Sequence, residues 1–294
     1  MLTRRRVLLA GLAFGALAGC RGPDALAGGR PSASMAVPRA VVFTGTPVPA
    51  PRPAAAAAPA VTRAQVVARY GHLSPHTWGF DAPGVLRVLP AAGRVIALTF
   101  DACGGRRGSG YDQDLIEFLR RHEIPATLFL NARWIDANPA AFRLLAAEPL
   151  FEIANHGTRH LPLSVTGRSA YGIPGTRSAG EVYDEIAGNQ AKLTRLLGKP
   201  PRFFRSGTAY CDDIAARIVT ALGERVVTFT VNGDGGTTFT AGQVGRTVAA
   251  AGDGSIVLCH MNHPERGTAA GIAAAVPSLL ARGYRFVQLP GEPR

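Results

Sequence analysis

Residues 98–105 read LTFDACGG, and this stretch decides how the rest of the chain is interpreted. An apolar, β-branched run that starts at Arg94 leads into it, and two glycines close it. A short apolar run that ends in a polar residue and glycines is typical of a buried strand that continues into a loop. In parallel α/β folds, functional side chains lie where strands end. Asp101 is therefore the first candidate functional residue.

Beyond Arg94, short strand-like runs alternate with amphipathic helical stretches. Seven strands are predicted, at 94–100, 126–130, 150–154, 201–205, 225–231, 255–259 and 284–289. Predicted helices between them include 114–122, 179–197 and 268–281, each closed by residues that stop helices. This alternation predicts an α/β fold with a parallel sheet and crossover helices, either open or closed into a barrel.

Two more predicted strands end in residues that can bind metals. Residues 155–160 read NHGTRH, and residues 257–260 read VLCH. Together with LTFDACGG, these ordered motifs resemble the signatures of the polysaccharide deacetylases, the NodB-like family 4 carbohydrate esterases. The resemblance covers residues 94–289 and implies a NodB-like distorted (β/α)7 barrel. It also implies a metal-dependent hydrolase that removes N-acetyl groups from sugars.

The resemblance assigns roles to four residues. His156 and His160 match the family's metal-binding pair, and neutral imidazoles suit a divalent ion, with zinc ranked first and cobalt second. Asp101 matches the catalytic base, which takes a proton from the attacking water. His260 matches the general acid, because an amide nitrogen departs poorly unless it is protonated. A structural aspartate or a buried structural histidine is the alternative for each.

Two further positions match the family more loosely. Arg205 takes the place of an arginine that orients the base, although the family's usual proline and tyrosine are absent beside it. Asp234 takes the place of an aspartate that pairs with that arginine, and Gly235 replaces an aromatic neighbour. A surface salt bridge or a turn aspartate would give the same pattern.

One position departs from the family. Its first motif has two adjacent aspartates, of which the second binds the metal, whereas Ala102 follows Asp101 here. Alanine cannot coordinate a metal, so either water completes the coordination sphere, Asp101 itself binds, or another side chain replaces the ligand. The nearby candidates are Asp112, Cys103 and His263, with Asp112 ranked first. Capping of the helix that starts near residue 114 explains Asp112 equally well. A pseudoenzyme that has lost the metal is the other alternative.

The cysteines leave several interpretations open. Apart from Cys20 in the N-terminal segment, the chain has three cysteines, Cys103, Cys211 and Cys259, and each lies near a predicted strand end or motif. Three is an odd number, so in an oxidising compartment at least one of these thiols would stay unpaired within the chain. A disulfide, a soft metal ligand or inert buried thiols are the alternatives.

The N-terminus predicts export. Residues 3–6 read TRRR, an apolar stretch covers 7–17, and residues 17–20 read LAGC, which resembles a bacterial lipobox. We expect residues 1–20 to be a signal peptide and Cys20 to carry a lipid anchor on the outer face of the cell membrane. An ordinary cleaved signal is the alternative. Residues 21–60 are rich in proline and alanine and predict a disordered tether.

Residues 61–93 are expected to pack on the domain as an extension, and residues 94–290 to form the deacetylase domain. The net charge of +12 predicts attraction to anionic envelope polymers, and export excludes nucleic acid as a partner. The expected substrate of the monomer is an N-acetylated envelope glycan such as peptidoglycan or poly-N-acetylglucosamine. The alternatives are an O-acetyl esterase, a small-amide hydrolase and a noncatalytic glycan-binding lipoprotein.

Overall fold

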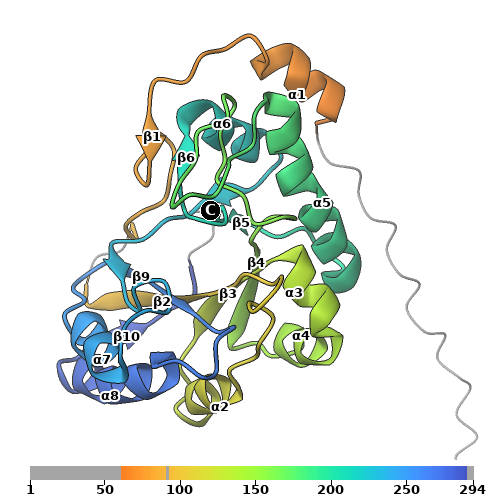
Figure 1. Ribbon diagram of the computed structural model, residues 1–294. Coiled ribbons are helices and arrows are strands. Elements are labelled where there is room, and N and C mark those ends of the chain that lie inside the picture. Colours follow the sequence, from red (N-terminus) through yellow and green to blue (C-terminus); the bar gives the residue numbers. More distant parts are fainter. Residues whose placement is uncertain (1–60, 91–92, 290–294) are drawn as a thin grey trace, which may run out of the picture. The chain divides into compact units, whose positions relative to one another are not determined.

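The computed structural model describes residues 61–90 and 93–289 (Figure 1). The predicted signal peptide (1–20) and tether (21–60) lie outside the described residues. No helix in the described part of the chain is long and apolar enough to cross a membrane.

A curled, largely parallel sheet forms the centre of the fold. Its hydrogen-bonded order is β7-β5-β4-β3-β2-β9-β8, with β10 paired to β2, and β1 and β6 form a separate antiparallel pair. The strands are β1 (Trp78–Gly79), β2 (Val95–Ala102), β3 (Ala126–Leu130), β4 (Phe151–Asn155), β5 (Phe203–Phe204), β6 (Cys211–Asp212), β7 (Arg225–Val226), β8 (Val231–Asn232), β9 (Ile256–His260) and β10 (Arg285–Phe286).

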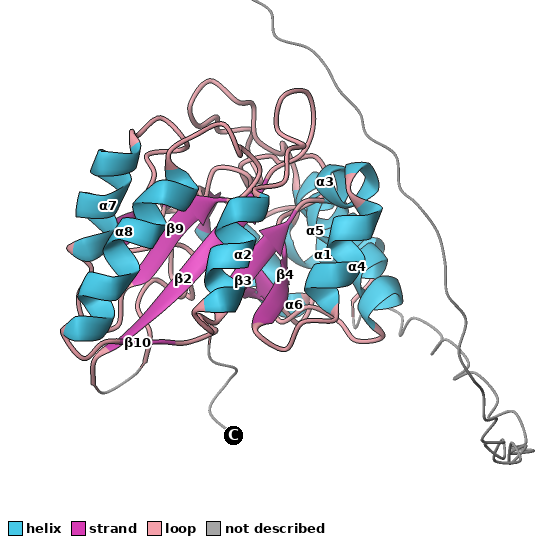
Figure 2. Cartoon of the chain, turned by 90° about the horizontal axis from the view of Figure 1, so that it is seen from below, coloured by secondary structure: helices cyan, strands magenta, loops and turns pink. Residues whose placement is uncertain are grey.

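Helices cover the outer face of this sheet. They are α1 (Arg63–Tyr70), α2 (Gln113–Arg121), α3 (Ala132–Ala137), α4 (Pro139–Ala146), α5 (Ala179–Leu197), α6 (Asp213–Ala221), α7 (Ala241–Ala249) and α8 (Thr268–Ala281). Figure 2 shows α7, α8, α2, α3 and α4 along the outside of β9, β2, β3 and β4. The prediction of an α/β, NodB-like distorted barrel is confirmed.

The central strands lie in the middle of the core because both of their faces are apolar. Every residue of β2 and β3 is buried, which matches the continuous apolar runs expected of parallel strands covered on two sides. On the outer side, Phe100 and Leu128 pack with Trp134 and Ile272 from the helices. In the register of β2 and β9, Asp101 lies opposite His260. The pairing of these two strands therefore brings two predicted site residues to one level.

The predicted strand at 225–231 is wrong in one respect, since it forms two short strands on opposite edges of the sheet. β7 pairs with β5, whereas β8 pairs with β9. The segment between them crosses from one edge to the other: Val227 N donates to Phe204 O at 2.8 Å, and Thr230 N donates to Ile256 O at 3.0 Å. The sheet curls far enough for one short segment to span its two edges. The edge strands β7 and β8 do not pair with each other, so the barrel is incompletely closed.

The segment before β2 packs against the sheet and against two helices. Val66 and Tyr70 of α1 lie in a buried cluster with Ile186 of α5 and Ile214 of α6. Leu86 N donates to Val226 O at 2.8 Å, so this segment also adds to the edge at β7.

A buried polar network supports the end of β4. Asn155 Nδ2 donates to Glu224 Oε1 at 3.0 Å, and Asn155 Oδ1 accepts from Asn189 Nδ2 and from Gly157 N, both at 2.9 Å. Glu224 Oε2 has no hydrogen-bond partner. Burial raises the pKa of Glu224 well above its usual value of 4.5, although the hydrogen bond from Asn155 opposes the shift. The folded chain therefore favours the protonated form of this carboxyl group.

We expect Glu224→Gln to remove a pH dependence of stability. The folded chain holds the Glu224 proton more tightly than the unfolded chain does. The contribution of this group to the free energy of unfolding is therefore fully present below pH 4.5 and is lost as pH rises through the folded pKa. The slope contributed by this group is about 1.4 kcal/mol per pH unit. Urea unfolding of both proteins at several pH values measures it. The exposed Glu117→Gln variant is the control, and parallel stability curves for wild type and Glu224→Gln would contradict the assignment.

Candidate active site

A buried ion pair fixes the first candidate residue at the end of β2. Arg205 Nη1 donates to Asp101 Oδ1 at 2.7 Å, and the remaining guanidinium donors reach Val227 O at 3.3 Å and Thr228 O at 3.1 Å. The guanidinium carbon also lies 4.0 Å from the ring centroid of Phe129. Burial lowers the pKa of Arg205, and the charge of Asp101 opposes this shift. Arg205 thus holds one carboxylate oxygen and leaves Oδ2 directed elsewhere.

His156 follows β4 directly, and its ring orientation is set by the backbone. Its Nδ1 lies 2.9 Å from the carbonyl oxygen of Arg205, which can only accept a hydrogen bond. Nδ1 therefore carries the proton, and Nε2 presents its lone pair, as in a metal-binding histidine. That Nε2 lies 3.6 Å from Asp101 Oδ2 and 3.8 Å from Cys103 Sγ.

His160 completes a cluster of metal-capable side chains. Its ring meets the ring of His156 edge to face, with centroids 4.8 Å apart. Ligand atoms of Cys103, His156 and His160 all lie within 4.8 Å of one another. Within residues 61–90 and 93–289, the buried Nε2 of His160 has no hydrogen-bond partner, which is costly unless a ligand satisfies it. A donor set of two imidazoles and a thiol fits zinc or cobalt, so the residues present suit the expected metal.

Glu185 of α5 holds the loop that carries His160, a role that no sequence motif predicts. One of its oxygens, Oε1, accepts from the backbone N–H of Arg159 at 3.0 Å, His160 at 2.8 Å and Leu161 at 3.2 Å. His160 itself has φ 66°, in the left-handed region that non-glycine residues rarely adopt. Burial raises the pKa of Glu185, and the backbone donors oppose this shift. These bonds stabilise a strained loop at the cluster.

His260 ends β9 and pairs with Asp234. Its Nδ1 lies 3.1 Å from both carboxylate oxygens of Asp234, and its backbone N–H donates to Oδ2 at 2.7 Å. Burial alone would lower the pKa of His260, but the charge and hydrogen bonds of Asp234, together with Cys103, raise it well above 6.5. Burial opposes ionisation of Asp234, and His260 nevertheless lowers the pKa of that carboxyl. The histidine is therefore protonated near neutral pH.

The predicted pairing of Asp234 with Arg205 is wrong. Arg205 pairs with Asp101, and Asp234 pairs with His260 instead. Asp234 is reached by Thr268 Oγ1 at 3.1 Å and by the backbone N–H groups of Gly236 and Thr237 at 3.1 and 3.3 Å. The glycine-rich turn after β8 folds around this carboxylate and directs it to β9.

The structure does not bring Asp112 into the cluster, so the prediction that it replaces the missing ligand is corrected. Asp112 caps α2, where Oδ1 accepts from Leu115 N at 3.1 Å. Its own N–H donates to Met261 O at 2.9 Å, which places it at the far end of the loop that leaves β2. Burial raises the pKa of Asp112, and the hydrogen bond from Leu115 opposes the shift. Capping, the alternative interpretation, describes this residue.

The three described cysteines are all free thiols, so no disulfide forms among them. Cys103 joins the histidine pair. Cys259 is fully buried in β9, and Cys211 is fully buried in β6. Burial raises the pKa of Cys211 to about 12, and Asp212 and Asp213 add to the shift. The latter two thiols fit the inert, buried alternative.

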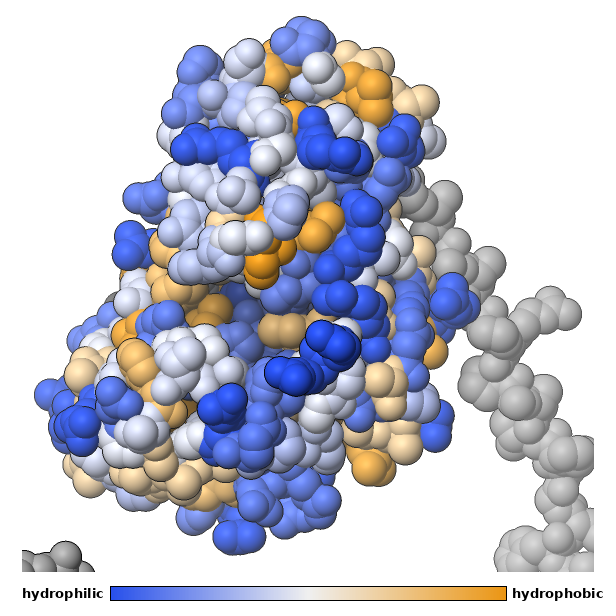
Figure 3. All heavy atoms as spheres, in the orientation of Figure 1, coloured by the Kyte–Doolittle hydropathy of each residue, from blue (hydrophilic) through white to orange (hydrophobic). Residues whose placement is uncertain are grey.

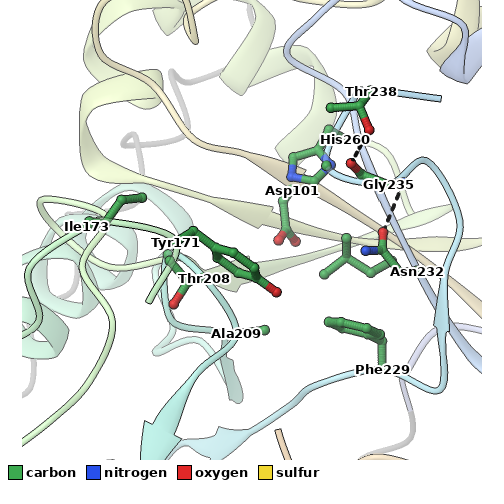
Figure 4. A pocket seen from close by; sticks show the side chains of 13 residues that line it. Asp101, Tyr171, Ile173, Thr208, Ala209, Phe229, Asn232, Gly235, Thr238 and His260 are labelled. Atoms are coloured by element: carbon green, nitrogen blue, oxygen red, sulfur yellow. Dashed lines mark hydrogen bonds between the residues drawn. The ribbon is translucent and has the colours of Figure 1, made fainter. Parts of the chain in front are cut away.

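A cavity of about 470 Å³ opens beside these groups. Asp101 and His260 line it, and Figure 4 shows Tyr171 extending into the cavity beneath Asp101, with Phe229 along another wall. The cavity is lined by Asp101, Tyr171, Ile173, Gly207, Thr208, Ala209, Phe229, Asn232, Gly235, Gly236, Thr238, Leu258 and His260. Such a mixture of apolar walls and a few converging polar groups is typical of a small-molecule or sugar site.

The face of the molecule drawn in Figure 3 is mainly hydrophilic. Figure 3 shows hydrophobic side chains on this face only in small groups between hydrophilic ones. Tyr171 is the most exposed of the large hydrophobic side chains in the described part of the chain, at 73%. An isolated exposed aromatic residue beside a cavity is suited to contact with a polar polymer.

Comparison with known proteins gives the family of this site. Residues 89–227 match the family model described as polysaccharide deacetylase. This match supports a polysaccharide deacetylase domain in that part of the chain. A peptidoglycan-N-acetylglucosamine deacetylase of Bacillus cereus is 27% identical over 203 residues, which are 68% of this chain and 88% of the relative. The prediction of a polysaccharide deacetylase, an enzyme of the hydrolase class, is confirmed by these matches.

Two solved structures share the fold of the deacetylase domain. A CE4 family pseudoenzyme from Bacillus anthracis has a TM-score of 0.60 and 19% identity, and the match covers 71% of this chain and 68% of the other. A family 4 acetyl xylan esterase from Clostridium thermocellum, solved with a cobalt ion, has a TM-score of 0.53 and 25% identity, with 66% and 88% covered. The fold therefore occurs in both an esterase and a pseudoenzyme, and the residues of the site must decide between such roles.

Proposed function

We propose that this deacetylase domain is a metal-dependent hydrolase that removes N-acetyl groups from a cell-envelope polysaccharide such as peptidoglycan or poly-N-acetylglucosamine. One observation carries the proposal: the Asp101 carboxylate and His260, which is paired with Asp234, line one cavity, and the metal-capable side chains lie next to Asp101. Separate groups for accepting and donating a proton, beside a metal, are what amide hydrolysis requires. A binding protein would need none of these three.

The metal would be held by His156 and His160, and when bound it supplies a Lewis acid that polarises the acetyl carbonyl and acidifies water. Asp101 Oδ2 is the free oxygen of a carboxylate whose other oxygen is held by Arg205. This oxygen is placed to take a proton from the attacking water. Arg205 fixes the direction of the carboxylate, so Asp101 acts as the base.

His260 is placed to donate a proton on the other side of the cavity end. Asp234 binds its Nδ1, so the opposite nitrogen, Nε2, is the one available to substrate. Because its pKa is raised well above 6.5, the ring is protonated near neutral pH and can protonate the leaving amine. The role of Asp234 is therefore to position and charge the acid, as in other carboxylate–histidine pairs.

The aromatic residues of the cavity fit a pyranose ring. Tyr171 packs edge to face on Tyr210, with centroids 5.5 Å apart, and Phe80 stacks between Tyr210 and Phe229, with centroid distances of 4.3 and 5.0 Å. These rings support one another, so Tyr171 can offer a preorganised face to a sugar next to the one that reacts.

We expect Tyr171→Ala to raise KM for a glycan oligomer about 10–100-fold with little change in kcat, because covering an aromatic face contributes about 1.5–3 kcal/mol to binding. Steady-state kinetics on N-acetylglucosamine oligomers measures this effect. The control is Leu144→Ala, since Leu144 is 61% exposed and lies outside the cavity lining. An unchanged KM for the tyrosine variant would remove this residue from substrate binding.

N-acetyl and O-acetyl substrates separate the proposal from its main alternative, an O-acetyl esterase. The two reactions differ in their need for an acid, since an alkoxide leaves more easily than an amide nitrogen. The raised pKa of His260 favours the amide. Acetate release from N-acetylglucosamine oligomers and from O-acetylated xylan, measured on one enzyme sample, is expected to favour the first substrate. Release from xylan alone would establish the esterase instead.

We also propose that the protein is exported and tethered to the outer face of the membrane through Cys20. The lipobox-like residues 17–20 and the proline- and alanine-rich residues 21–60 support this location. An envelope polysaccharide would lie within reach of a domain held in this way.

A further inference from the structure

The residue after Asp101 is Ala102, whose side chain is buried in the hydrophobic core and cannot take part in the site. Ala102 is fully buried and packs in the cluster between the sheet and the outer helices. The third metal ligand, which the family's motif carries at this position, is therefore missing from it. Any replacement must come from a side chain that already reaches His156 and His160.

Cys103 is the side chain that does so, and its backbone is held firmly. Gly104 and Gly105 have φ of 69° and 81°, and Gly104 N donates to Gly108 O at 2.8 Å, which turns the chain immediately after the cysteine. A Cβ added at Gly104 would lie 2.5 Å from Trp134 N, so this close approach requires glycine. Arg133 Nη2 also donates to Cys103 O at 3.3 Å. The turn directs Sγ to within 3.8 Å of His156 Nε2.

We propose that Cys103 supplies a thiolate as the third protein ligand, and that the site is a Cys-His-His metal centre. This inference rests on the proposed metal-dependent function. Three protein ligands leave a fourth position for water or substrate, as in catalytic zinc sites. The buried, unpartnered Nε2 of His160 supports the same centre, because a metal ion would satisfy it.

The other candidate ligands are engaged elsewhere. Asp112 caps α2, and His263 Nδ1 lies 3.1 Å from Glu265 Oε1. Neither belongs to the group of mutually close ligand atoms. Cys259 Sγ faces Gly233, and Cys211 lies in the small sheet with β1. Cys103 is thus the thiol that can reach both histidines.

A thiolate ligand has a chemical consequence that a carboxylate does not have. Thiolates are soft ligands that select zinc and cobalt, whereas carboxylates also suit manganese, magnesium and calcium. We therefore expect this centre to bind zinc and cobalt and to discriminate against the harder ions. The replacement of a carboxylate by Cys103 changes metal choice and does not abolish binding.

Cobalt spectroscopy on the purified full-length chain tests the inference. Wild type loaded with Co²⁺ is expected to show a thiolate-to-cobalt charge-transfer band in the near ultraviolet. Cys103→Ser is expected to lose that band and to bind cobalt at least about tenfold more weakly in chelator competition, because residues that only support ligands are already worth about 10–100-fold. Cys103→Asp is expected to restore binding without the band. Cys211→Ser is the matched control and is expected to keep both.

Cobalt bound by wild type without a charge-transfer band would overturn the inference, as would a band that persists in Cys103→Ser. A chain that binds no cobalt would overturn the inference and the metal-dependent function together. A chain with the band but without acetate release would keep the Cys-His-His centre and reject only the proposed hydrolysis. Failure of the thiolate ligand alone is therefore distinguished from failure of the proposed hydrolysis.

Discussion

Asp101→Asn is expected to lower kcat for deacetylation roughly 10²–10⁴-fold, which is the usual contribution of a general base. Asparagine keeps an oxygen that can accept the hydrogen bond from Arg205 Nη1, which is 2.7 Å long in the wild type, so the guanidinium keeps this partner. What is lost is the carboxylate oxygen that faces His156 Nε2 at 3.6 Å. Acetate release by equal amounts of folded, metal-loaded protein measures the effect.

Metal content separates this role from that of a ligand. If Asp101 acts as the base, the asparagine variant binds zinc at the same stoichiometry as wild type while its kcat falls. Asp136→Asn is the control, because Asp136 is a surface carboxylate that pairs with Lys192 at 2.7 Å. Loss of zinc in parallel with activity would show that Asp101 coordinates the metal instead.

Arg205→Met is expected to lower the free energy of unfolding by about 3–5 kcal/mol, as is usual when one partner of a buried ion pair is removed. The change leaves the buried carboxylate of Asp101 without its partner and also removes donors to two backbone carbonyls. Urea unfolding followed by circular dichroism gives the value. Arg202→Met, which breaks the partly exposed pair with Glu152, should cost under about 1 kcal/mol.

A double-mutant cycle tests the pair itself. The combined Asp101→Asn, Arg205→Met variant should be more stable than the sum of the two single effects predicts, because neither charge is then left buried alone. Additive effects would mean that Arg205 stabilises the fold through Phe129 and the backbone and not through Asp101.

The sequence predicted those parts of the fold that depend on local patterns. The predicted helices 179–197 and 268–281 coincide with α5 and α8, because capping residues such as Ser178 and Gly198 mark helix ends directly. The predicted strand ends also placed Asp101, His156 and His260 at one edge of the sheet. The structure then brings these residues together through strand pairing, as in the alignment of Asp101 with His260.

What the sequence could not predict depends on contacts between distant segments. The run 225–231 looks like one strand, yet the curl of the sheet splits it between two edges. The partner of Asp234 follows from the turn after β8, and no residue pattern distinguishes His260 from Arg205 as that partner. Cys103 was a candidate ligand ranked below Asp112, because the turn at Gly104 that aims its thiol is set by close approach to Trp134. Glu185 and Tyr171 carry no motif.

The proposed metal-dependent N-deacetylation is tested most directly by measuring acetate release from N-acetylated peptidoglycan fragments and N-acetylglucosamine oligomers. Wild type and His156→Ala are compared with added zinc and with added cobalt. Acetate release by wild type is expected to need the metal and to be lost in the variant, since His156 presents its Nε2 to the cluster. No release by wild type with either metal, or equal release by the variant, would contradict the proposed metal-dependent hydrolysis.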